Sequence, residues 1–266
     1  VDLSKSETQW FPYDKLIIGT GARSRRLNLP GSNASNIFTL KDLQDGIRIR
    51  NYVDEKRPKR VAILGGGFIA LEMCEAFRLR DLETFLFCRK DLPVGNLERE
   101  ISEKILKELQ DNGVHFLAHH EPADFKTNGT DEVTTFETHK ASYRVDMVLM
   151  ALGVIPNVEL AREAGIELGK TGAIRTDKSQ KTNLADTYAA GDCCEVFNLV
   201  SQDWMYTPLG DIANKQGRVA GDNAAGKKAV FHGVVGSAAF KVFELEVAFT
   251  GLGTQVAQRY GFDVDS

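Results

Sequence analysis

Long apolar runs are missing from this chain of 266 residues. No segment of it reaches the ~18 to 20 consecutive apolar residues that a membrane-spanning helix needs. The amino-terminal residues VDLSKSETQW also lack the apolar core of a secretory signal. We therefore expect a cytoplasmic protein without a membrane partner.

Cysteines are few, and positive charge is not in excess. The four cysteines follow neither a CxxC nor a paired metal-ligand spacing, which argues against a disulfide framework and against a metal site. Cys193 and Cys194 are adjacent, and we expect two small buried thiols there in preference to a strained vicinal disulfide. The net charge of −4 offers no basic field, so no nucleic-acid partner is expected.

The most informative feature that is present is the segment Val61–Glu72, which reads VAILGGGFIALE. A short apolar strand leads into a glycine turn and then a helix, the context in which a GxGxxG/A pattern indicates dinucleotide binding. Gly65 would allow the tight turn, Gly67 would let a pyrophosphate reach the N–H groups at the helix start, and Ala70 would keep the helix close to the sheet. An ordinary strand-to-helix connection is the alternative, and the flanking elements disfavour it.

Strands and helices alternate around this turn. We expect an amphipathic helix within residues 37–58, a strand at Thr84–Phe87, a helix over Leu97–Asn112 and an apolar strand within Val145–Leu152. The first of these helices is expected to turn one face inward, made of Leu40, Leu43, Ile47 and Tyr52. The βαβα order predicts an α/β fold with a parallel sheet.

The segments on either side of this region carry further signals. Tyr13–Gly21 is expected to form a buried strand that ends in a glycine turn, and Thr182–Asp192 an extended segment that ends on Gly-Asp. Asp211–Ala225 predicts a helix, and strands are expected again at Lys241–Phe249. At 266 residues, the chain has room for about two domains of the usual ~100 to 200 residues.

The end of the second strand decides which nicotinamide cofactor such a site prefers, because NAD-specific proteins place an acid there about 20 residues beyond the glycines. In this chain Cys88 stands at that point (88 − 65 = 23), and Arg89 and Lys90 follow it. Two cations without a carboxylate would attract a 2′-phosphate. We therefore expect NADPH, or both NADPH and NADH; a solvated loop residue is the alternative interpretation of Arg89.

Several separated motifs resemble one family, the FAD-dependent pyridine nucleotide-disulfide oxidoreductases. In chain order they are YDKLIIGTGA, GGGFIALE, ALGVIPN and TNLADTYAAGD. Within that family, PLGDIANKQGR at Pro208–Arg218 and the later KVFELEVAFTGL are most similar to the branch of coenzyme A-disulfide reductases, NADH oxidases and NADH peroxidases. Four ordered motifs along nearly the whole chain are more specific than any one of them.

The resemblance implies a Rossmann-like three-layer NAD(P) domain inserted into a partial FAD domain of similar topology, followed by the start of an α+β dimerisation domain. On that template, residues 1–44 belong to the first FAD-binding segment, 45–155 to the NAD(P)-binding domain, 156–228 to the second FAD-binding segment and 229–266 to the dimerisation domain. The family's FAD-pyrophosphate fingerprint and the redox cysteine of this branch are expected upstream of Val1. No residue of this chain is therefore assigned as catalytic.

On the flavin side, the resemblance implies cofactor contacts from seven residues: Thr20, Gly21, Ala22, Gly191, Asp192, Leu209 and Gly210. Asp192 would hydrogen-bond the flavin ribitol chain, and Gly191 would let the backbone come close; a plain Gly-Asp turn is the alternative. The helix that starts near Leu209 and Gly210 would aim its N-terminal dipole at the flavin and favour the negative charge of its reduced form. Ser24 stands where the family usually has proline, so that turn is expected to differ.

On the nicotinamide side, the resemblance places Phe68 at the family's aromatic gate over the flavin, and Glu72 at the carboxylate that contacts the nicotinamide carboxamide. Ile69 is assigned to the same cofactor-binding helix start, and Gly153 would line the groove from a strand end. A core phenylalanine and an exposed helix glutamate are the competing interpretations of Phe68 and Glu72.

The implied activity is that of a flavoprotein oxidoreductase. It would pass hydride from NAD(P)H to FAD, and electrons on to a cysteine-based acceptor such as coenzyme A disulfide, a persulfide, a peroxide or oxygen. The full-length protein is expected to be a homodimer, and this chain alone is expected to be inactive. One alternative is a non-catalytic nucleotide-binding fragment of such an enzyme. Another is a rubredoxin or ferredoxin reductase, which the tail KVFELEVAFTGL disfavours.

Overall fold

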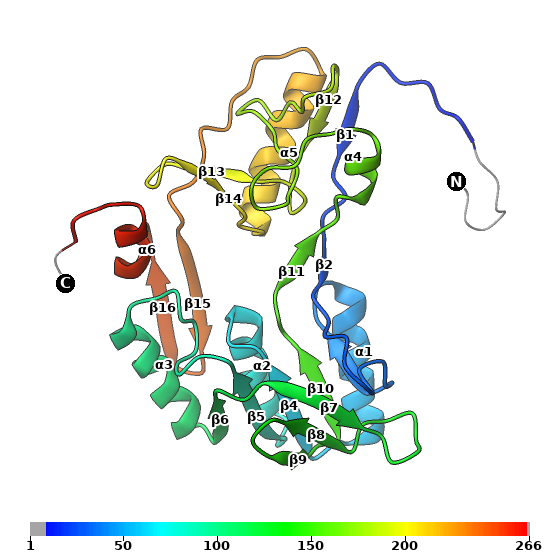
Figure 1. Cartoon of the computed structure of the whole chain (residues 1–266), viewed down its shortest axis with the longest axis vertical. Coiled ribbons are helices and arrows are strands. Elements are labelled where there is room, and N and C mark those ends of the chain that lie inside the picture. Colours follow the sequence, from blue (N-terminus) through cyan, green and yellow to red (C-terminus); the bar gives the residue numbers. More distant parts are fainter. Residues whose placement is uncertain (1–8, 265–266) are drawn as a thin grey trace. The chain divides into compact units, whose positions relative to one another are not determined.

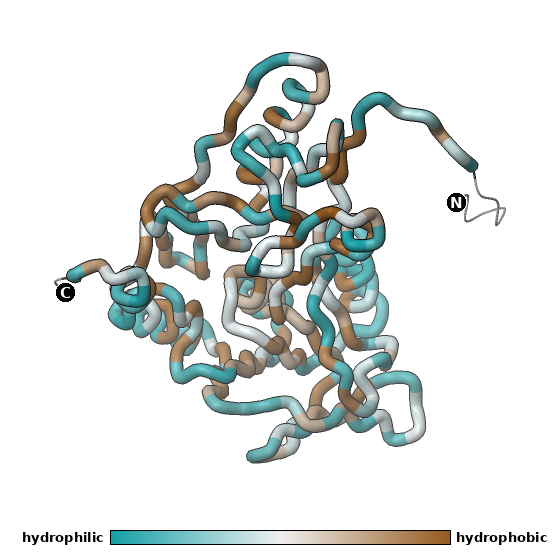
Figure 2. Tube along the Cα trace, turned by 45° about the horizontal axis from the view of Figure 1, so that its top comes forward, coloured by the Kyte–Doolittle hydropathy of each residue, from teal (hydrophilic) through white to brown (hydrophobic). Residues whose placement is uncertain are grey.

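The computed structural model describes residues 9–264, and the chain divides into two compact units (Figure 1). The first unit combines the described residues up to Ala22 with Pro156–Val235, and the second combines Arg23–Ile155 with the described residues from Gly236 onward. Hydrophobic stretches are short and alternate with hydrophilic ones along the chain (Figure 2). None of the helices formed by residues 9–264 combines the length and the apolar character of a membrane span.

A five-stranded sheet forms the centre of the second unit. Its strands lie in the order β3 (Ile37–Thr39), β10 (Met147–Met150), β4 (Arg60–Leu64), β5 (Glu83–Cys88) and β6 (Val114–Ala118). Every neighbouring pair runs parallel, which confirms the predicted parallel sheet. Since β4 lies between β10 and β5, the carboxyl ends of these three strands meet at one edge of the sheet, where ligands bind in folds of this kind.

Helices cover one face of this sheet, and a small antiparallel sheet covers the other. The helices are α1 (Leu43–Lys56), α2 (Phe68–Arg78) and α3 (Arg99–Asp111). The antiparallel sheet consists of β7 (Pro122–Lys126), β8 (Thr135–Thr138) and β9 (Ser142–Arg144). Successive side chains of β4 point to opposite faces of the sheet, and each face has its own hydrophobic core. Val61 and Ile63 pack with the helices. Ala62 and Leu64 pack on the other face, in the core that contains Phe125 and Phe136. The unit therefore has three layers.

Helix α1 begins later than the sequence pattern predicted and buries a different face. Asp42 caps it, because the Asp42 carboxylate accepts a hydrogen bond from the backbone N–H of Asp45 at 2.9 Å. Leu43 is 76% exposed and Ile47 is also exposed, so the inward face predicted for these two residues was wrong. The cap fixes where the helix begins. The residues that it buries instead include Ile49 and Val53.

The first unit is built on two paired strands and a long helix. β1 (Leu16–Ile18) pairs in parallel with β12 (Thr187–Ala189), and α5 (Gly210–Ala224) contacts both strands. The prediction of a buried strand over Tyr13–Gly21 was wrong in its burial, because Ile17 is 42% exposed. Within the described structure β1 has one strand neighbour, so one of its edges stays open. The smaller elements are α4 (Glu159–Glu163), β13 (Val196–Asn198) and β14 (Asp203–Met205).

Two further strand pairs and a short helix complete the described part of the fold. β2 (Ala22–Ser24) pairs with β11 (Val154–Pro156). At the end of the second unit, β15 (Ala238–Val242) and β16 (Leu245–Phe249) form an antiparallel hairpin, and α6 (Thr254–Arg259) follows. Strands were expected within Lys241–Phe249, and the chain turns inside that range at Phe243, whose φ is +49°.

The hairpin and α6 belong to the second unit. Residues 23–44 also belong to the second unit, although the family template gives them to the first FAD-binding segment. Along the chain, one boundary between the units falls between Ile155 and Pro156, and the template has a domain boundary at the same place. The division into FAD, NAD(P) and dimerisation domains stays a prediction.

Candidate functional site

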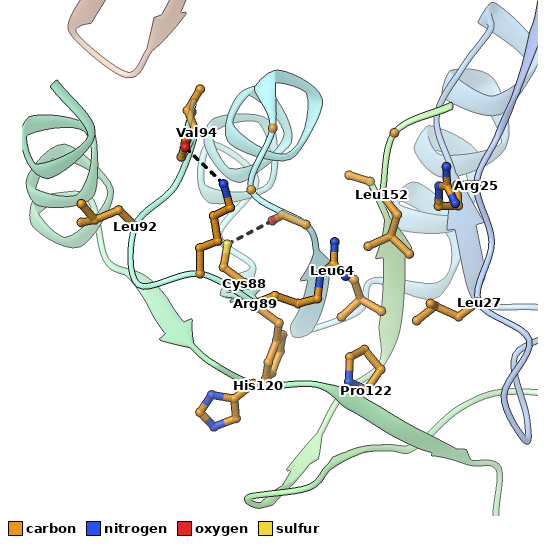
Figure 3. A pocket seen from close by; sticks show the side chains of 18 of the residues that line it. Arg25, Leu27, Leu64, Cys88, Arg89, Leu92, Val94, His120, Pro122 and Leu152 are labelled. Atoms are coloured by element: carbon orange, nitrogen blue, oxygen red, sulfur yellow. Dashed lines mark hydrogen bonds between the residues drawn. The ribbon is translucent and has the colours of Figure 1, made fainter. Parts of the chain in front are cut away.

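A cavity of about 820 Å³ lies in the second unit, at the carboxyl ends of β4, β5 and β10 (Figure 3). Three chain segments that follow these strands line it, namely Gly65–Gly67, Cys88–Lys90 and Ala151–Gly153. The loop that leads to α3 contributes Leu92 and Val94–Asn96. Five of the residues predicted to bind the cofactor line this cavity, namely Gly65, Gly67, Cys88, Arg89 and Gly153.

The glycine turn is shaped by two different constraints. Gly65 has a φ of +121°, and a Cβ built on it would overlap the carbonyl oxygen of Ala151. Gly67 has no atom within 4 Å of a built Cβ, so the space in front of it is open. Gly67 is also the N-cap of α2, without a side-chain cap hydrogen bond. The N–H groups of the first helical turn therefore face the cavity side with no side chain of the cap satisfying them, as a pyrophosphate site requires.

The end of β5 is neutral and tightly packed against this turn. The thiol of Cys88 donates a hydrogen bond to the carbonyl oxygen of Gly65, and its Sγ lies 2.7 Å from a Cβ built on Gly66. Burial raises the pKa of the Cys88 thiol to about 12, so the group is protonated at neutral pH. No anion stands at this position.

The two cations that follow Cys88 are placed differently. The Lys90 ammonium donates a hydrogen bond to the carbonyl oxygen of Gly95 at 3.1 Å, and its side chain packs beside that glycine. Arg89 is exposed, and its side chain is directed into the cavity (Figure 3). Arg25 lines the cavity beyond Leu152. The guanidinium groups of Arg89 and Arg25 are thus the cationic groups offered to a ligand, while Lys90 holds the loop.

The remaining nicotinamide-side predictions lie on α2 outside the lining of the cavity. Ala70 is fully buried against the sheet, in the packing role expected of it. Ile69 and Glu72 are exposed. The ring of Phe68 is half-buried and packs against Phe240 of β15 in a tilted arrangement, with ring centroids 4.6 Å apart. Cofactor contacts for these residues stay predictions.

Residues predicted for the flavin side lie together in the first unit, at the carboxyl ends of β1 and β12. The Thr20 hydroxyl donates to the carbonyl oxygen of Asn157 at 2.6 Å, and the Asn157 side-chain amide donates to the carbonyl oxygen of Thr20 at 2.9 Å. The backbone N–H of Asn157 donates to the carbonyl oxygen of Gly21, whose φ is +67°. This reciprocal set holds the turn after β1 in one conformation.

The Gly-Asp turn after β12 is held by a buried amide of α5. Gln216 accepts a hydrogen bond from the N–H of Gly191 at 2.9 Å and donates to the carbonyl oxygen of Glu195 at 3.0 Å. Gly191 has a φ of +87°, which favours glycine, and the carbonyl oxygen of Asp192 accepts from the Tyr206 hydroxyl at 2.9 Å. The Asp192 carboxylate is half-buried.

Helix α5 starts beside this turn. Its N-cap Leu209 provides no side-chain hydrogen bond, and Gly210 at the first helical position is exposed. The N–H groups of the first turn are thus without a side-chain cap from Leu209, which suits a dipole contact to an electron-rich group. Ala22, the remaining residue of the predicted set, begins β2.

Cys193 and Cys194, next to this turn, are buried free thiols, as predicted. The Cys193 Sγ donates to the carbonyl oxygen of Ala190 at 3.3 Å. Cys74 and Cys88 are buried free thiols as well. Within residues 9–264, no group of three or more His, Cys, Asp or Glu side chains is placed to hold a metal ion.

Sequence reasoning did not find several residues of the cavity wall. Arg25 and Leu27 reach it from a segment about 40 positions before the glycine turn (65 − 25 = 40). Asn96 lies in the loop between β5 and α3, and His120 follows β6. The loop after the second strand could have been searched from the sequence, because it must border the same edge of the sheet. Arg25 had no such signal.

Comparisons with known proteins indicate one family. The model of the family described as pyridine nucleotide-disulphide oxidoreductase matches residues 1–213. An NAD(P)H sulfur oxidoreductase (CoA-dependent) of Pyrococcus abyssi is 32% identical over 255 residues, which cover 96% of this chain and 56% of that protein. The chain therefore spans about half the length of the curated relatives that it matches.

Solved structures resemble the chain along nearly its whole length. An NAD-dependent persulfide reductase from A. fulgidus superposes with a TM-score of 0.90 at 35% identity, covering 95% of this chain and 47% of the other. An engineered water-forming NADPH oxidase bound to NADPH, a mutant of the Lactobacillus brevis NADH oxidase, superposes with a TM-score of 0.90 at 25% identity, covering 98% of this chain and 57% of the other.

Proposed function

The chain belongs to the pyridine nucleotide-disulphide oxidoreductase family, and on that premise we propose that it is the nucleotide-binding part of an enzyme that passes hydride from NAD(P)H to FAD. The observation that carries this proposal is the open N-terminus of α2 at the cavity of about 820 Å³. A cavity of this size accommodates a dinucleotide half, and uncapped helix N–H groups favour a pyrophosphate.

Residues of the glycine turn, of α2 and of the turn after β10 would bind and orient the nicotinamide nucleotide. Gly67 and the first turn of α2 would hold the pyrophosphate, and Gly65 keeps the turn tight enough for the strand end to approach it. Gly153, with a φ of +84°, would line the groove in which the nicotinamide half lies. Ile69 and Glu72 would contact the same half from the exposed side of α2.

The residues of the first unit fit FAD. Thr20, Gly21 and Ala22 would pass beside it, Asp192 would accept hydrogen bonds from its ribitol hydroxyls, and Gly191 would let the backbone approach. The positive end of α5 at Leu209 and Gly210 would favour negative charge on the flavin ring. Bound there, FAD would supply hydride acceptance and onward electron transfer.

We favour NADPH, with NADH as a second donor. Cys88 places no carboxylate against a 2′-phosphate, and Arg89 offers it a guanidinium. In the engineered NADPH oxidase, a glycine-to-alanine exchange precedes an aspartate-to-alanine exchange by 18 residues, and an alanine-to-arginine exchange follows directly. This chain carries Ala70, Cys88 and Arg89 at that same spacing (88 − 70 = 18).

The acceptor would be a small molecule. A disulfide such as coenzyme A disulfide, a persulfide, a peroxide or oxygen each fits the relatives, whose names include sulfur oxidoreductase, persulfide reductase and NADPH oxidase. We further propose a cytoplasmic homodimer in the full-length protein, without nucleic-acid or membrane partners. The buried free thiols suit a reducing compartment.

The test is the visible absorption spectrum of the purified protein after FAD is added and the excess is removed, followed by anaerobic titration with NADPH. A retained flavin band that bleaches would support the proposal. A colourless protein that binds NADPH would limit this chain to a nucleotide-binding part. A protein that binds neither compound would contradict the proposal.

A further inference from the structure

The side-chain amide of Gln216 bridges the two ends of the Gly-Asp turn that follows β12. Its Oε1 accepts a hydrogen bond from the N–H of Gly191 at 2.9 Å, and its Nε2 donates to the carbonyl oxygen of Glu195 at 3.0 Å. The residue is only 1% exposed, so water does not compete for either bond. A buried amide that is hydrogen-bonded at both ends keeps one orientation, and so does the backbone that it joins.

Asp192 lies inside this turn, and the backbone on both sides of it is fixed. The N–H of Gly191, which precedes it, is bonded to Gln216, and the N–H of Cys194 closes the turn on the carbonyl oxygen of Gly191 at 2.8 Å. The carbonyl oxygen of Asp192 itself accepts from the Tyr206 hydroxyl at 2.9 Å. Burial raises the pKa of Tyr206, so this hydroxyl is protonated and can donate at neutral pH. The direction of the Asp192 side chain therefore depends on Gln216 and Tyr206.

Helix α5 contacts the turn directly. The helix begins at Gly210, and Gln216 follows six positions later (216 − 210 = 6), which is less than two helical turns. A Cβ built on Gly191 would lie 3.6 Å from the Cβ of Ala213, so no side chain separates the helix from the turn. The amide of Gln216 thus links the turn to the same rigid helix whose N-terminus begins beside it.

We propose that Gln216 and Tyr206 are positioning residues that hold the Asp192 carboxylate in the orientation in which it binds the flavin ribitol. The inference rests on the proposed function, in which Asp192 accepts hydrogen bonds from the ribitol hydroxyls of FAD. An acceptor binds a hydroxyl well only when its lone pairs point toward it, and a turn that is ordered in advance loses less entropy on binding. All of these contacts lie within the first unit.

Removing these hydrogen bonds should weaken FAD binding. The net value of one hydrogen bond corresponds to roughly 2- to 10-fold in an equilibrium constant. Tyr206→Phe removes one bond and should raise the FAD dissociation constant by that factor. Gln216→Met keeps the length of the side chain but removes two bonds, so the increase should be roughly 5- to 100-fold. Binding of NADPH should not change, because the cavity proposed for it is lined by residues of the second unit.

A third variant separates hydrogen bonding from packing. In Gln216→Glu, an ionised carboxylate still accepts from the N–H of Gly191 but has no proton to donate to the carbonyl oxygen of Glu195. A protonated carboxyl group makes both bonds, as the amide does, and burial raises the pKa of a carboxyl group. Gln216→Glu should therefore bind FAD weakly at pH 8 and recover toward the affinity of the unmodified protein at pH 5.5, whereas Gln216→Met should stay weak at both.

The experiment uses two readouts on the full-length protein. Quenching of flavin fluorescence during titration of the flavin-free protein gives the FAD dissociation constant of each variant at pH 8 and pH 5.5. Hydrogen–deuterium exchange followed by mass spectrometry reports on the peptide that contains Gly191, whose N–H should exchange faster in Gln216→Met even without FAD. Asn214→Met is the matched control, because it replaces an exposed amide of the same helix and should leave both readouts unchanged.

Two outcomes would overturn the inference. If exchange at Gly191 is the same in Gln216→Met and the unmodified protein, the amide does not hold the turn. If exchange becomes faster but Gln216→Glu binds FAD equally well, or equally weakly, at the two pH values, the contact does not position the ligand group. Failure of the unmodified protein to bind FAD would instead overturn the proposed function, and the exchange readout would still decide whether Gln216 holds the turn.

Discussion

The Cys88 thiol lies 3.4 Å from the carbonyl oxygen of Gly65 and donates a hydrogen bond to it. This contact joins the end of β5 to the turn after β4, between the two places that would hold the adenine ribose and the pyrophosphate. A carboxylate in place of the thiol would bring an anion to the same point. Nucleotide preference and the geometry of the glycine turn are therefore linked through one side chain.

Replacing Cys88 by aspartate should move the preference toward NADH. A carboxylate there would accept hydrogen bonds from ribose hydroxyls and repel a 2′-phosphate, so the ratio of the NADPH and NADH dissociation constants should rise at least about tenfold. Titration calorimetry with both nucleotides measures it. Cys88→Ser is the matched control, since it keeps a donor for Gly65 without a charge. A ratio that is the same in both variants would contradict the assignment of this position.

Alanine substitutions of Arg89 and Lys90 should have different effects on nucleotide binding, although the two residues are neighbours with the same charge. Arg89→Ala should weaken NADPH binding by about 1 to 3 kcal/mol through loss of a charge-assisted hydrogen bond, with little effect on NADH. Lys90→Ala should affect both nucleotides alike, because Lys90 is bonded to Gly95 in the loop. Equal effects of Arg89→Ala on NADPH and NADH would mean that no 2′-phosphate is bound there.

Substitutions at Gly65 and Gly67 should have different effects: one should lower the stability of the fold, and the other should weaken nucleotide binding. Gly65→Ala should lower the free energy of unfolding by at least about 2 kcal/mol, because Gly65 has a positive φ and its Cβ would overlap the backbone of Ala151. Gly67→Ala should leave stability nearly unchanged, since no atom lies within 4 Å of its Cβ, and should still weaken nucleotide binding by blocking the pyrophosphate. Urea unfolding and calorimetry distinguish the two; loss of stability in Gly67→Ala would refute this division.

The buried thiols of Cys74 and Cys88 should make the protein less stable at alkaline pH. Burial raises the pKa of Cys88 to about 12 and that of Cys74 further, above the value of 9.0 for a free thiol. Above pH 9 the unfolded chain releases these protons while the folded chain retains them, so stability present below pH 9 is lost as pH rises. Each group contributes a slope of up to about 1.4 kcal/mol per pH unit. The urea midpoint should fall less steeply between pH 8 and 10.5 in Cys88→Ser than in the unmodified protein. If the dependence of the midpoint on pH is the same in both proteins, the pKa of Cys88 is not raised by folding.

The parts of the site that could be predicted are local in the sequence. The strand, the glycine turn and the helix lie within residues 60–78, where the spacing of glycines and apolar residues defines them, and Cys88 was selected by counting along the chain. The central sheet was predicted as parallel from the βαβα order. The order of its strands was not, because β10 inserts between β3 and β4 from a distant segment that no local pattern encodes.

Some side chains have the same charge or fit the same pattern in the sequence but differ in their contacts. Only the structure shows these differences. Lys90 and Arg89 were treated as a pair of cations until the bond from Lys90 to Gly95 set them apart. Phe68 was assigned a gate role by resemblance, but its contact with Phe240 depends on a hairpin far along the chain. Leu43 was expected to be buried on helical periodicity, but it is exposed, and α1 packs through Ile49 and Val53 instead.

The hydrogen bond from Phe243 to Glu75 closes a separation of 168 residues, and this has a consequence for synthesis on the ribosome. Residues 23–155 leave the ribosome before the hairpin that covers α2 has been translated, because 81 positions separate Ile155 from Gly236 (236 − 155 = 81). At ~5 to 20 residues per second, the nascent α2 surface would wait roughly 4 to 16 s for its cover. Contacts this remote also slow folding after release. The apolar surface around Phe68 would thus be uncovered during translation at a time when every residue that lines the cavity has already been made.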